Sequence, residues 1–147
     1  FARPSSAGGK NVPVTDALKE TVLVLGHLAR KQGSKLELEL PQDLPIVEED
    51  ETALREIFFN LVSNSLEAAG PGGEVIVRGL SDQTHLTIEV RDTGPGIPPE
   101  VQDRLFEPFV TTKSNGTGLG LYLVGRTLRE LGGDIHCETE RTRGTVF

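Results

Sequence analysis

The sequence has 147 residues, of which 36% are hydrophobic and 25% are charged, and its formal net charge is −7. This length fits one domain with its own core, and no apolar run approaches the about 20 residues that a membrane-spanning helix needs. The acidic balance argues against a nucleic-acid-binding protein, because such proteins need a basic surface, and the single cysteine excludes an internal disulfide.

The chain opens with a Gly-, Pro- and Ser-rich stretch over residues 1–11, which is typical of a linker or of the tail of a preceding element. Apolar residues at helical spacing predict a helix over residues 15–33, with Thr15 or Asp16 as its N-cap and Gly33 as its stop signal. The first residue, Phe, and the ending "RGTVF" lead us to expect a fragment of a longer protein.

The next part of the chain predicts a strand, a turn region and a second helix. Strict alternation over residues 35–40 indicates a half-buried strand, and residues 41–50 form a turn region. Asp50 is a candidate N-cap for a helix over residues 51–69. One arc of this helix is apolar and predicts its core face: Leu54, Ile57, Phe58, Leu61, Val62 and Leu66.

The second half of the chain predicts four strands and a further long helix. We expect a hairpin of two strands over residues 74–80 and 85–92, followed by a long loop over 93–116 that contains one short helix over 98–105. A long helix over 117–131 and two final strands over 132–140 and 144–147 complete the chain. Helices and strands are segregated more than they alternate. This order predicts an α+β fold, a two-layer α/β sandwich with about five strands in a mixed sheet under three long helices.

The arc of the 51–69 helix opposite its core face is polar and carries Glu56, Asn60, Ser63, Asn64 and Glu67. One interpretation is a solvated face. However, asparagine is a mediocre helix former, and two asparagines at i and i+4 are neighbours on a helix surface. Their amide oxygens suit Mg²⁺, which takes one or two protein oxygens together with substrate phosphates. Both interpretations stay open on this helix alone.

Asp92 stands where a predicted strand runs into the turn "DTGPGI". A carboxylate in this place can accept a hydrogen bond from an exocyclic amine such as the adenine N6, and Gly94 and Gly96 let the backbone approach a flat base. The alternative is an ordinary turn, because Asp, Gly and Pro are common turn residues.

Three glycines on alternate positions, Gly116, Gly118 and Gly120, precede the last long helix. They match neither the P-loop nor the dinucleotide-binding pattern. A helix N-terminus still offers unpaired N–H groups and a positive dipole end, and glycines there would admit phosphates. The alternative is a flexible joint. Lys113 lies just upstream and is a candidate contact for a terminal phosphate.

Four motifs in order resemble the ATP-binding catalytic domain of bacterial sensor histidine kinases, in the superfamily that includes DNA gyrase B. They are "NLVSNSLEA" (N box), "DTGPGI" (G1 box), "LFEPFVTTK" (F box) and "GTGLGLYLV" (G2 box), and the wording of the last two is most similar to nitrogen-regulator sensor kinases. The resemblance implies a catalytic domain over residues 12–147 with its last strand cut short. Residues 1–11 would then end a preceding dimerisation hairpin.

The resemblance implies ATP or ADP and Mg²⁺ as ligands and gives the matching residues roles. Asn64 would ligate Mg²⁺, with Asn60 a second candidate ligand that faces the triphosphate. Asp92 would bind adenine, assisted through water by Thr145, with Gly94, Gly96 and Ile97 around the base. Phe106 and Phe109 would anchor a mobile lid. The remaining nucleotide contacts would be Thr111, Thr112, Lys113, Gly116, Thr117, Gly118, Leu119, Gly120 and Leu121.

The resemblance also bears on the reaction. Asn60 and Lys113 are the candidate catalytic residues, with Glu56, one turn before Asn60, as a secondary candidate. Related ATPases carry a water-activating glutamate at the position of Asn60, and an amide cannot act as that general base. We therefore favour phosphoryl transfer to a histidine. A gyrase-like ATPase or an anti-sigma-factor type of Ser/Thr kinase is the alternative.

The acceptor histidine is expected outside this chain, because none of the three histidines (His27, His85 and His136) lies in a matching motif. The expected partners are the dimerisation hairpin of the same protein and a response regulator, with no nucleic acid. We expect the fragment to be monomeric and cytoplasmic, and the full-length protein to be a homodimer.

Overall fold

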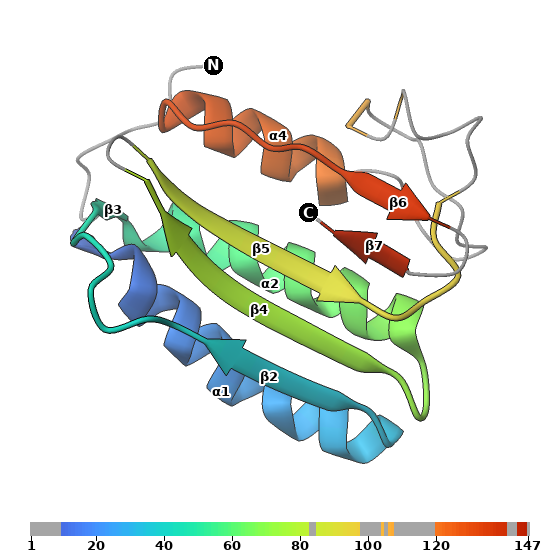
Figure 1. Ribbon diagram of the computed structural model, residues 1–147. Helices are drawn as coiled ribbons and strands as arrows, with labels where there is room; N and C mark the ends of the chain where they lie inside the picture. Colours follow the sequence, from blue (N-terminus) through green and yellow to red (C-terminus); the bar gives the residue numbers. More distant parts are fainter. Residues whose placement is uncertain are drawn as a thin grey trace.

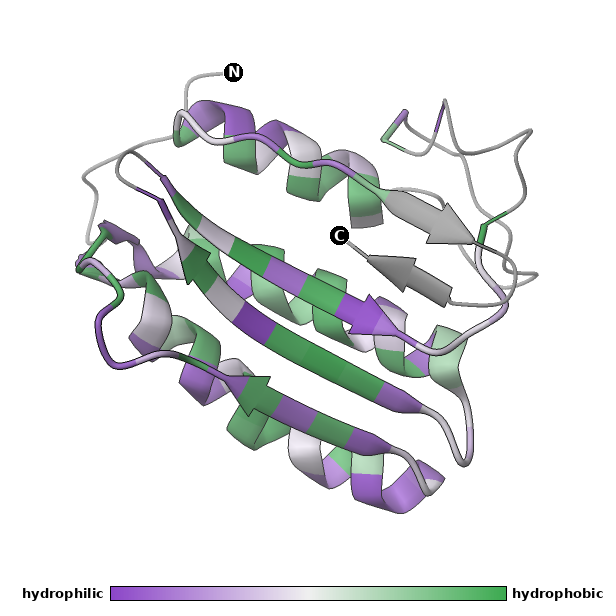
Figure 2. Ribbon diagram, in the orientation of Figure 1, coloured by the Kyte–Doolittle hydropathy of each residue, from purple (hydrophilic) through white to green (hydrophobic). Residues whose placement is uncertain are grey.

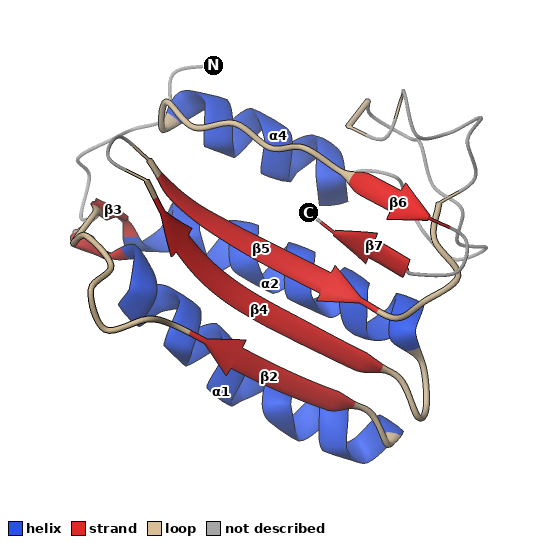
Figure 3. Cartoon of the chain, viewed as in Figure 1, coloured by secondary structure: helices blue, strands red, loops and turns tan. Residues whose placement is uncertain are grey.

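The computed structural model describes residues 10–82, 85–97, 104, 106–107, 120–140 and 144–146. Within these residues, helices α1 (Val14–Gln32) and α2 (Glu51–Ala69) cover one face of a five-stranded sheet, and α4 (Gly120–Glu130) packs beside α2 (Figures 1 and 3). None of the described helices is both long enough and apolar enough to cross a bilayer. The predicted two-layer α+β sandwich is confirmed.

The large sheet has the strand order β2-β4-β5-β7-β6. Its strands are β2 (Lys35–Glu39), β4 (Glu74–Ser81), β5 (Leu86–Asp92), β6 (Glu138–Glu140) and β7 (Gly144–Val146). The β2–β4 pair is parallel and the other pairs are antiparallel, so the sheet is mixed as predicted. A parallel pair needs a long crossover, and α2 lies in the connection between β2 and β4.

A second, two-stranded sheet pairs β1 (Asn11–Pro13) with β3 (Glu48–Asp50) in antiparallel register. The sequence does not predict it, because three residues carry too little alternation to show a period of two. The turn region expected over residues 41–50 therefore ends in a strand. This small sheet joins the segment before α1 to the segment before α2.

The start of α1 differs from the sequence prediction. The helix begins at Val14 with Pro13 as its N-cap residue, and no side chain caps it, so the assignment of Thr15 or Asp16 as the cap was wrong. The Val14 N–H donates instead to the Val47 carbonyl at 2.7 Å, so a backbone contact satisfies a donor that a cap would otherwise bind. The predicted stop is confirmed, since Gly33 adopts φ 79° in the left-handed region.

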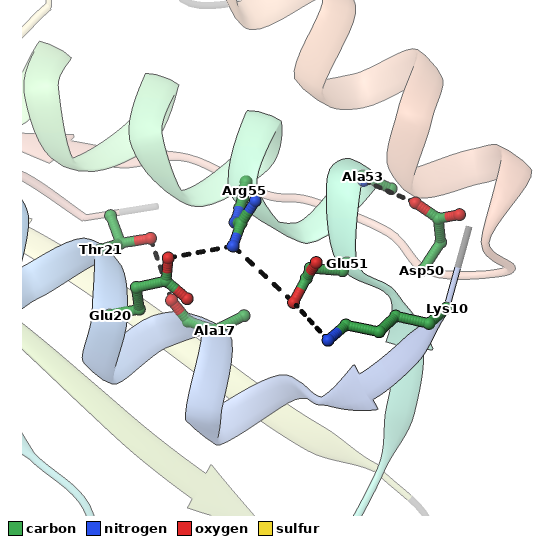
Figure 4. A network of polar contacts seen from close by, with 8 residues as sticks. All are labelled: Lys10, Ala17, Glu20, Thr21, Asp50, Glu51, Ala53 and Arg55. Atoms are coloured by element: carbon green, nitrogen blue, oxygen red, sulfur yellow. Dashed lines mark hydrogen bonds and ion pairs between the residues drawn. The ribbon is translucent and has the colours of Figure 1, made fainter. Parts of the chain in front are cut away.

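Helix α2 has the predicted bounds and the predicted cap. Asp50 Oδ1 accepts a hydrogen bond from the Ala53 N–H at 2.9 Å (Figure 4). All six residues of the predicted core face are buried. They pack on the helix-facing side of the sheet, where Val75, Val77 and Val90 are fully buried. Figure 2 shows hydrophobic and hydrophilic residues alternating along β2 and β5, whereas β4 carries a continuous hydrophobic run from Val75 to Val77.

The second half of the chain follows the prediction with shorter elements. The β4–β5 hairpin is confirmed, with Val77 opposite Val90. Of the strand expected over 132–140, only Glu138–Glu140 is a strand, because Gly132 and Gly133 form the turn that ends α4: Gly132 has φ 81° and the Gly133 N–H donates to the Leu128 carbonyl. Apart from residue 104, the short helix expected over 98–105 lies outside the described residues.

Candidate nucleotide-binding site

The polar face of α2 presents Asn60 and Asn64 toward α4, one helical turn apart. The Asn60 side-chain Nδ2 donates to the Glu56 backbone carbonyl at 2.8 Å. This bond anchors the amide nitrogen on its own helix, so Asn60 directs its carbonyl oxygen, Oδ1, away from the helix toward the start of α4. Both asparagines are partly buried, which distinguishes this face from a fully solvated one.

Asp92 ends β5 on the helix-facing side of the sheet and is 1% exposed. Its Oδ1 accepts a hydrogen bond from the Gly94 N–H at 2.8 Å, which is the geometry of an Asx turn. The turn is closed beyond it, because the Thr93 N–H donates to the Glu74 carbonyl and the Glu74 N–H donates to Thr93 Oγ1. Asp92 is therefore held at the end of β5, where the following turn meets the carboxyl end of α2.

Gly94 has a packing reason to be glycine. A Cβ at this position would lie 2.5 Å from the Ala68 carbonyl oxygen of α2, which is closer than real Cβ contacts come. Gly96, two residues later, adopts φ 83°, a conformation that glycine adopts without strain. The glycines of this turn thus let it press against the carboxyl end of α2. The turn continues into Ile97, which is partly buried.

The sheet places Thr145 directly opposite Asp92. The two residues are Cα partners in the antiparallel β5–β7 pair. The predicted association of these two positions is therefore present in the backbone register, although they are more than fifty residues apart in the sequence.

The start of α4 lies against the two asparagines. A Cβ built on Gly120 would stand 3.5 Å from Asn60 Oδ1 and 3.7 Å from Asn64 Nδ2, both ordinary contact distances. Leu121 follows Gly120 and packs against the core. The structure thus brings together the N-box asparagines and the last glycine of the G2 box.

Phe106 of the F box packs against α4 at Gly125. A Cβ on Gly125 would lie 3.8 Å from Phe106 Cβ and from its ring, an ordinary contact distance, so Phe106 lies directly over Gly125. The partner proposed for it, Phe109, lies outside the described residues, as do seven of the predicted nucleotide contacts: Thr111, Thr112, Lys113, Gly116, Thr117, Gly118 and Leu119.

Two further residues of α2 were not predicted from the sequence, one at this site and one buried beside it in the sequence. Ala68 supplies the carbonyl against which the Gly94 turn packs. Ser65, beside Asn64, is 1% exposed, and its Oγ has no hydrogen-bond partner in the part of the chain that the structure describes. The signal for Ser65 was a hydroxyl on the apolar arc of the helix, among the core residues.

The candidate metal ligands of this region are side-chain amides. Among the described residues, no three His, Cys, Asp or Glu side chains gather in a way that could hold a metal ion. Asn60 turns its Oδ1 toward the start of α4, and an amide oxygen is a hard ligand suited to a cation that keeps water and phosphate as its other ligands; the Asn64 atom nearest Gly120 is Nδ2.

Similarity to known protein families agrees with this geometry. The family profile described as "Histidine kinase-, DNA gyrase B-, and HSP90-like ATPase" matches residues 49–147, which include α2, the β5 turn and α4. The chain belongs to this ATPase family. The matched range contains every residue that the structure brings together around Asn60 and Asn64.

Among relatives in this family, sporulation kinase E of Bacillus subtilis is 33% identical over 148 residues, which cover 100% of this chain and 20% of that protein. The sensory histidine kinase/phosphatase NtrB of Rhizobium leguminosarum is 39% identical over 118 residues, 69% of this chain and 31% of that protein. The chain therefore spans about a fifth to a third of the length of these curated relatives. The family match and these relatives together place the chain among the ATP-binding catalytic domains of sensor histidine kinases.

A solved structure of the catalytic domain of histidine kinase ThkA has a TM-score of 0.83 to this chain at 29% identity, with 95% of this chain and 91% of that chain covered. ThkA has also been solved in complex with the response regulator protein TrrA. The fold is thus shared with a histidine kinase catalytic domain over nearly its whole length.

Proposed function

We propose that this domain binds ATP with Mg²⁺ between α2, the turn after β5 and the start of α4, and that it donates the γ-phosphoryl group to a histidine on a separate hairpin of the whole protein. The observation that carries the proposal is the close approach of Gly120 to Asn60 and Asn64: a Cβ placed on Gly120 would lie 3.5 Å from Asn60 Oδ1 and 3.7 Å from Asn64 Nδ2. Two amides and a side-chain-free helix start at one point are suited to a polyphosphate and its cation.

At the adenine end, Asp92 would accept a hydrogen bond from the N6 amine through the carboxylate that the Asx turn holds in place. Guanine carries a carbonyl at that position, so Asp92 would reject it. Thr145, opposite Asp92 in the sheet, would support this contact through water, and Gly94, Gly96 and Ile97 would lie around the base.

At the phosphate end, Asn64 is the proposed Mg²⁺ ligand and Asn60 faces the triphosphate as a second candidate ligand. Asn60 fits such a cation, because its Nδ2 is used by the Glu56 carbonyl and its oxygen is turned toward Gly120. Asn64, whose Nδ2 is the atom nearest Gly120, would present its oxygen after rotation of its side-chain amide. Mg²⁺ would supply charge neutralisation for the phosphates. Gly120 and Leu121 would contact the phosphates from the helix start, together with Gly116, Thr117, Gly118, Leu119, Thr111, Thr112 and Lys113.

The chain's own groups favour transfer over hydrolysis. Asn60 is an amide and cannot remove a proton from water, so the site has no general base at that position. Catalysis would consist of positioning and charge stabilisation by Asn60 and Lys113, with Glu56 in a secondary role. The response regulator would receive the phosphoryl group from the histidine in a later step. ATP is cytoplasmic, so the domain would work there, as a monomer when separated from the hairpin that dimerises the whole protein.

The direct test supplies a purified dimerisation hairpin of the parent kinase in trans, with γ-labelled ATP and Mg²⁺. We expect label on the hairpin that is stable to base and lost in acid, as a phosphohistidine is. Acid-stable label on Ser or Thr would favour the protein-serine kinase alternative. Release of inorganic phosphate without labelled protein would favour the ATPase. The matched control replaces the acceptor histidine of the hairpin with alanine.

A further inference from the structure

Ser65 carries a buried hydroxyl that its own helix does not use. Its side chain is 1% exposed, and its Oγ has no hydrogen-bond partner among the residues that the structure describes. Two other helix hydroxyls donate to the backbone carbonyl four residues earlier: Thr21 to Ala17 at 3.0 Å and Ser63 to Phe59 at 2.6 Å. Ser65 instead turns its Oγ away from its helix. Because a buried hydroxyl is costly unless it is hydrogen-bonded, this group calls for a partner beyond α2.

The neighbours of Ser65 on α2 place its side chain against two strand ends of the sheet. Ala68 and Ala69, three and four residues later, lie next to Ser65 on the helix surface. A Cβ on Gly94, which follows β5, would lie 2.5 Å from the Ala68 carbonyl oxygen. A Cβ on Gly73, which precedes β4, would overlap the Ala69 carbonyl. The helical turn that starts at Ser65 therefore lies over the end of β5 and the start of β4.

Asp92 occupies this corner of the sheet. It ends β5 with its side chain on the helix-facing side, 1% exposed, and it is the Cα partner of Val75 near the start of β4. A Cβ on Gly94 would lie 3.0 Å from Asp92 Oδ1 as well as 2.5 Å from the Ala68 oxygen, so both oxygens lie close to one point. Ser65 and Asp92 are thus two buried polar side chains in the same corner between α2 and the sheet.

The Ala68 carbonyl is a third polar group in this corner. In a continuing helix it would accept from the Gly72 N–H, but that N–H donates to the Gly33 carbonyl at 2.9 Å. The end of α2 therefore leaves the Ala68 oxygen to other donors. An internal water makes about three hydrogen bonds and is found where polar groups converge. Ser65 Oγ, the Ala68 oxygen and the Asp92 carboxylate are such a set.

We propose that Ser65 is a positioning residue for base recognition, and that its Oγ shares one ordered water with the Asp92 carboxylate. The water accepts from the Ser65 hydroxyl and donates to the Asp92 carboxylate and to the Ala68 carbonyl, so both of its hydrogens are used. This bridge orients the carboxylate that receives the 6-amine of the base. It supports Asp92 from the helix layer, whereas Thr145 belongs to the sheet. The proposal rests on the proposed function, because it takes the adenine contact of Asp92 from it.

The test compares ATP with purine riboside triphosphate, in which a hydrogen replaces the 6-amine, by calorimetric titration of this chain in the presence of Mg²⁺. Ser65→Ala removes the bridge, so we expect affinity for ATP to fall about three- to tenfold while affinity for the analogue stays within about twofold of wild type. The preference for ATP over the analogue therefore shrinks. An unchanged preference, whether both affinities fall together or neither falls, would overturn the proposal.

Two further variants separate the hydrogen bond from packing. Ser34→Ala is the matched control, because Ser34 is also buried but its Oγ donates to the Ala29 carbonyl, between α1 and β2. We expect it to keep the preference for ATP. Ser65→Cys nearly keeps the side-chain volume and replaces the hydroxyl with a weak hydrogen-bonding group, so it should lose preference as Ser65→Ala does. Full preference in Ser65→Cys would show that volume, and not the hydroxyl, is what matters.

A double-mutant cycle shows whether Ser65 acts through Asp92. With Asp92→Asn already in place, Ser65→Ala should change ATP affinity by less than about twofold, because the charged group that the water orients is gone. Equal losses in both backgrounds would mean that Ser65 acts independently, against the proposal. A wild-type chain without any preference for ATP over the analogue would defeat the adenine role of Asp92 and this proposal together. A wild-type preference that Ser65→Ala leaves intact would defeat only the role of Ser65.

Discussion

At the scale of single residues, two side chains carry the proposed nucleotide chemistry, and one glycine makes their arrangement possible. Asp92 is buried, and Asn60 has its amide nitrogen anchored and its oxygen presented. Gly94 joins them, because the turn that positions Asp92 can reach α2 only without a Cβ. Packing and chemistry can therefore be separated by substitution at these positions.

Asp92→Asn tests the chemistry. The asparagine Oδ1 can still accept from the Gly94 N–H, so we expect little change in the free energy of unfolding. The charged acceptor for the adenine amine is lost, which costs about 1.5–3 kcal/mol of binding, or about ten- to hundredfold in Kd. Calorimetric titration with ATP measures it, with GTP as the comparison ligand. Equal wild-type affinity for ATP and GTP would contradict the role of Asp92.

Gly94→Ala tests the packing. The new methyl group would meet the Ala68 backbone carbonyl at 2.5 Å, and a helix backbone cannot yield easily, so we expect a loss of about 1–3 kcal/mol in urea unfolding. Gly79→Ala is the control. Its Cβ would be as close, 2.7 and 2.8 Å, to Leu40 and Leu44, but those atoms are the ends of flexible side chains that can move. A loss at Gly79→Ala as large as that at Gly94→Ala would show that the Ala68 contact is not decisive.

At the scale of elements, α2 is the helix that the sequence specifies most completely. The helix has a side-chain cap, an apolar arc of six buried residues and a terminal glycine, and all three features predict the same helix. Its predicted bounds are those observed. In α1 the cap prediction failed because the Val47 carbonyl, a residue of a distant segment, takes the place of a local side chain. Local patterns reveal local contacts, and the β1–β3 pair, like the Gly94–Ala68 approach, forms between segments far apart in the chain.

This difference between the helices can be measured by removing the caps. Asp50→Ala removes the acceptor of the Ala53 N–H, and we expect it to cost about 1 kcal/mol of stability. Thr15→Ala should cost much less, since α1 has no side-chain cap. Thermal or urea unfolding of both variants checks the expectation, and equal losses would mean that Asp50 does not stabilise α2 as a cap.

Gly120→Ala separates helix stability from ligand binding in α4. The added Cβ would make only ordinary contacts with Asn60 and Asn64, and alanine is a better helix former, so the fold should be as stable or up to about 1 kcal/mol more stable. The methyl group would occupy the place proposed for a phosphate, so we expect ATP affinity to fall. Unaltered affinity would remove Gly120 from the phosphate contacts.

At the scale of the whole molecule, the candidate site lies where three elements meet between the sheet and the helix layer: β5, α2 and α4. Strand β5 ends at Asp92, its following turn packs on the end of α2 at Ala68, and α4 begins at Gly120 against the asparagines of α2. The sequence motifs identified these parts and their order. They did not reveal how the parts meet, because that depends on the packing of α4 beside α2 and on the β5–β7 register, both of which are long-range.

The central claim is that Mg·ATP binds at this meeting point, and titration of the isotope-labelled domain followed by NMR tests it most directly. We expect the largest shift changes at the side-chain amides of Asn60 and Asn64 and at the backbone amides of Asp92, Gly94 and Gly120, with the changes reduced when Mg²⁺ is withheld. Shift changes confined to other surfaces, such as the sheet face away from the helices, or none at saturating ATP, would contradict the claim.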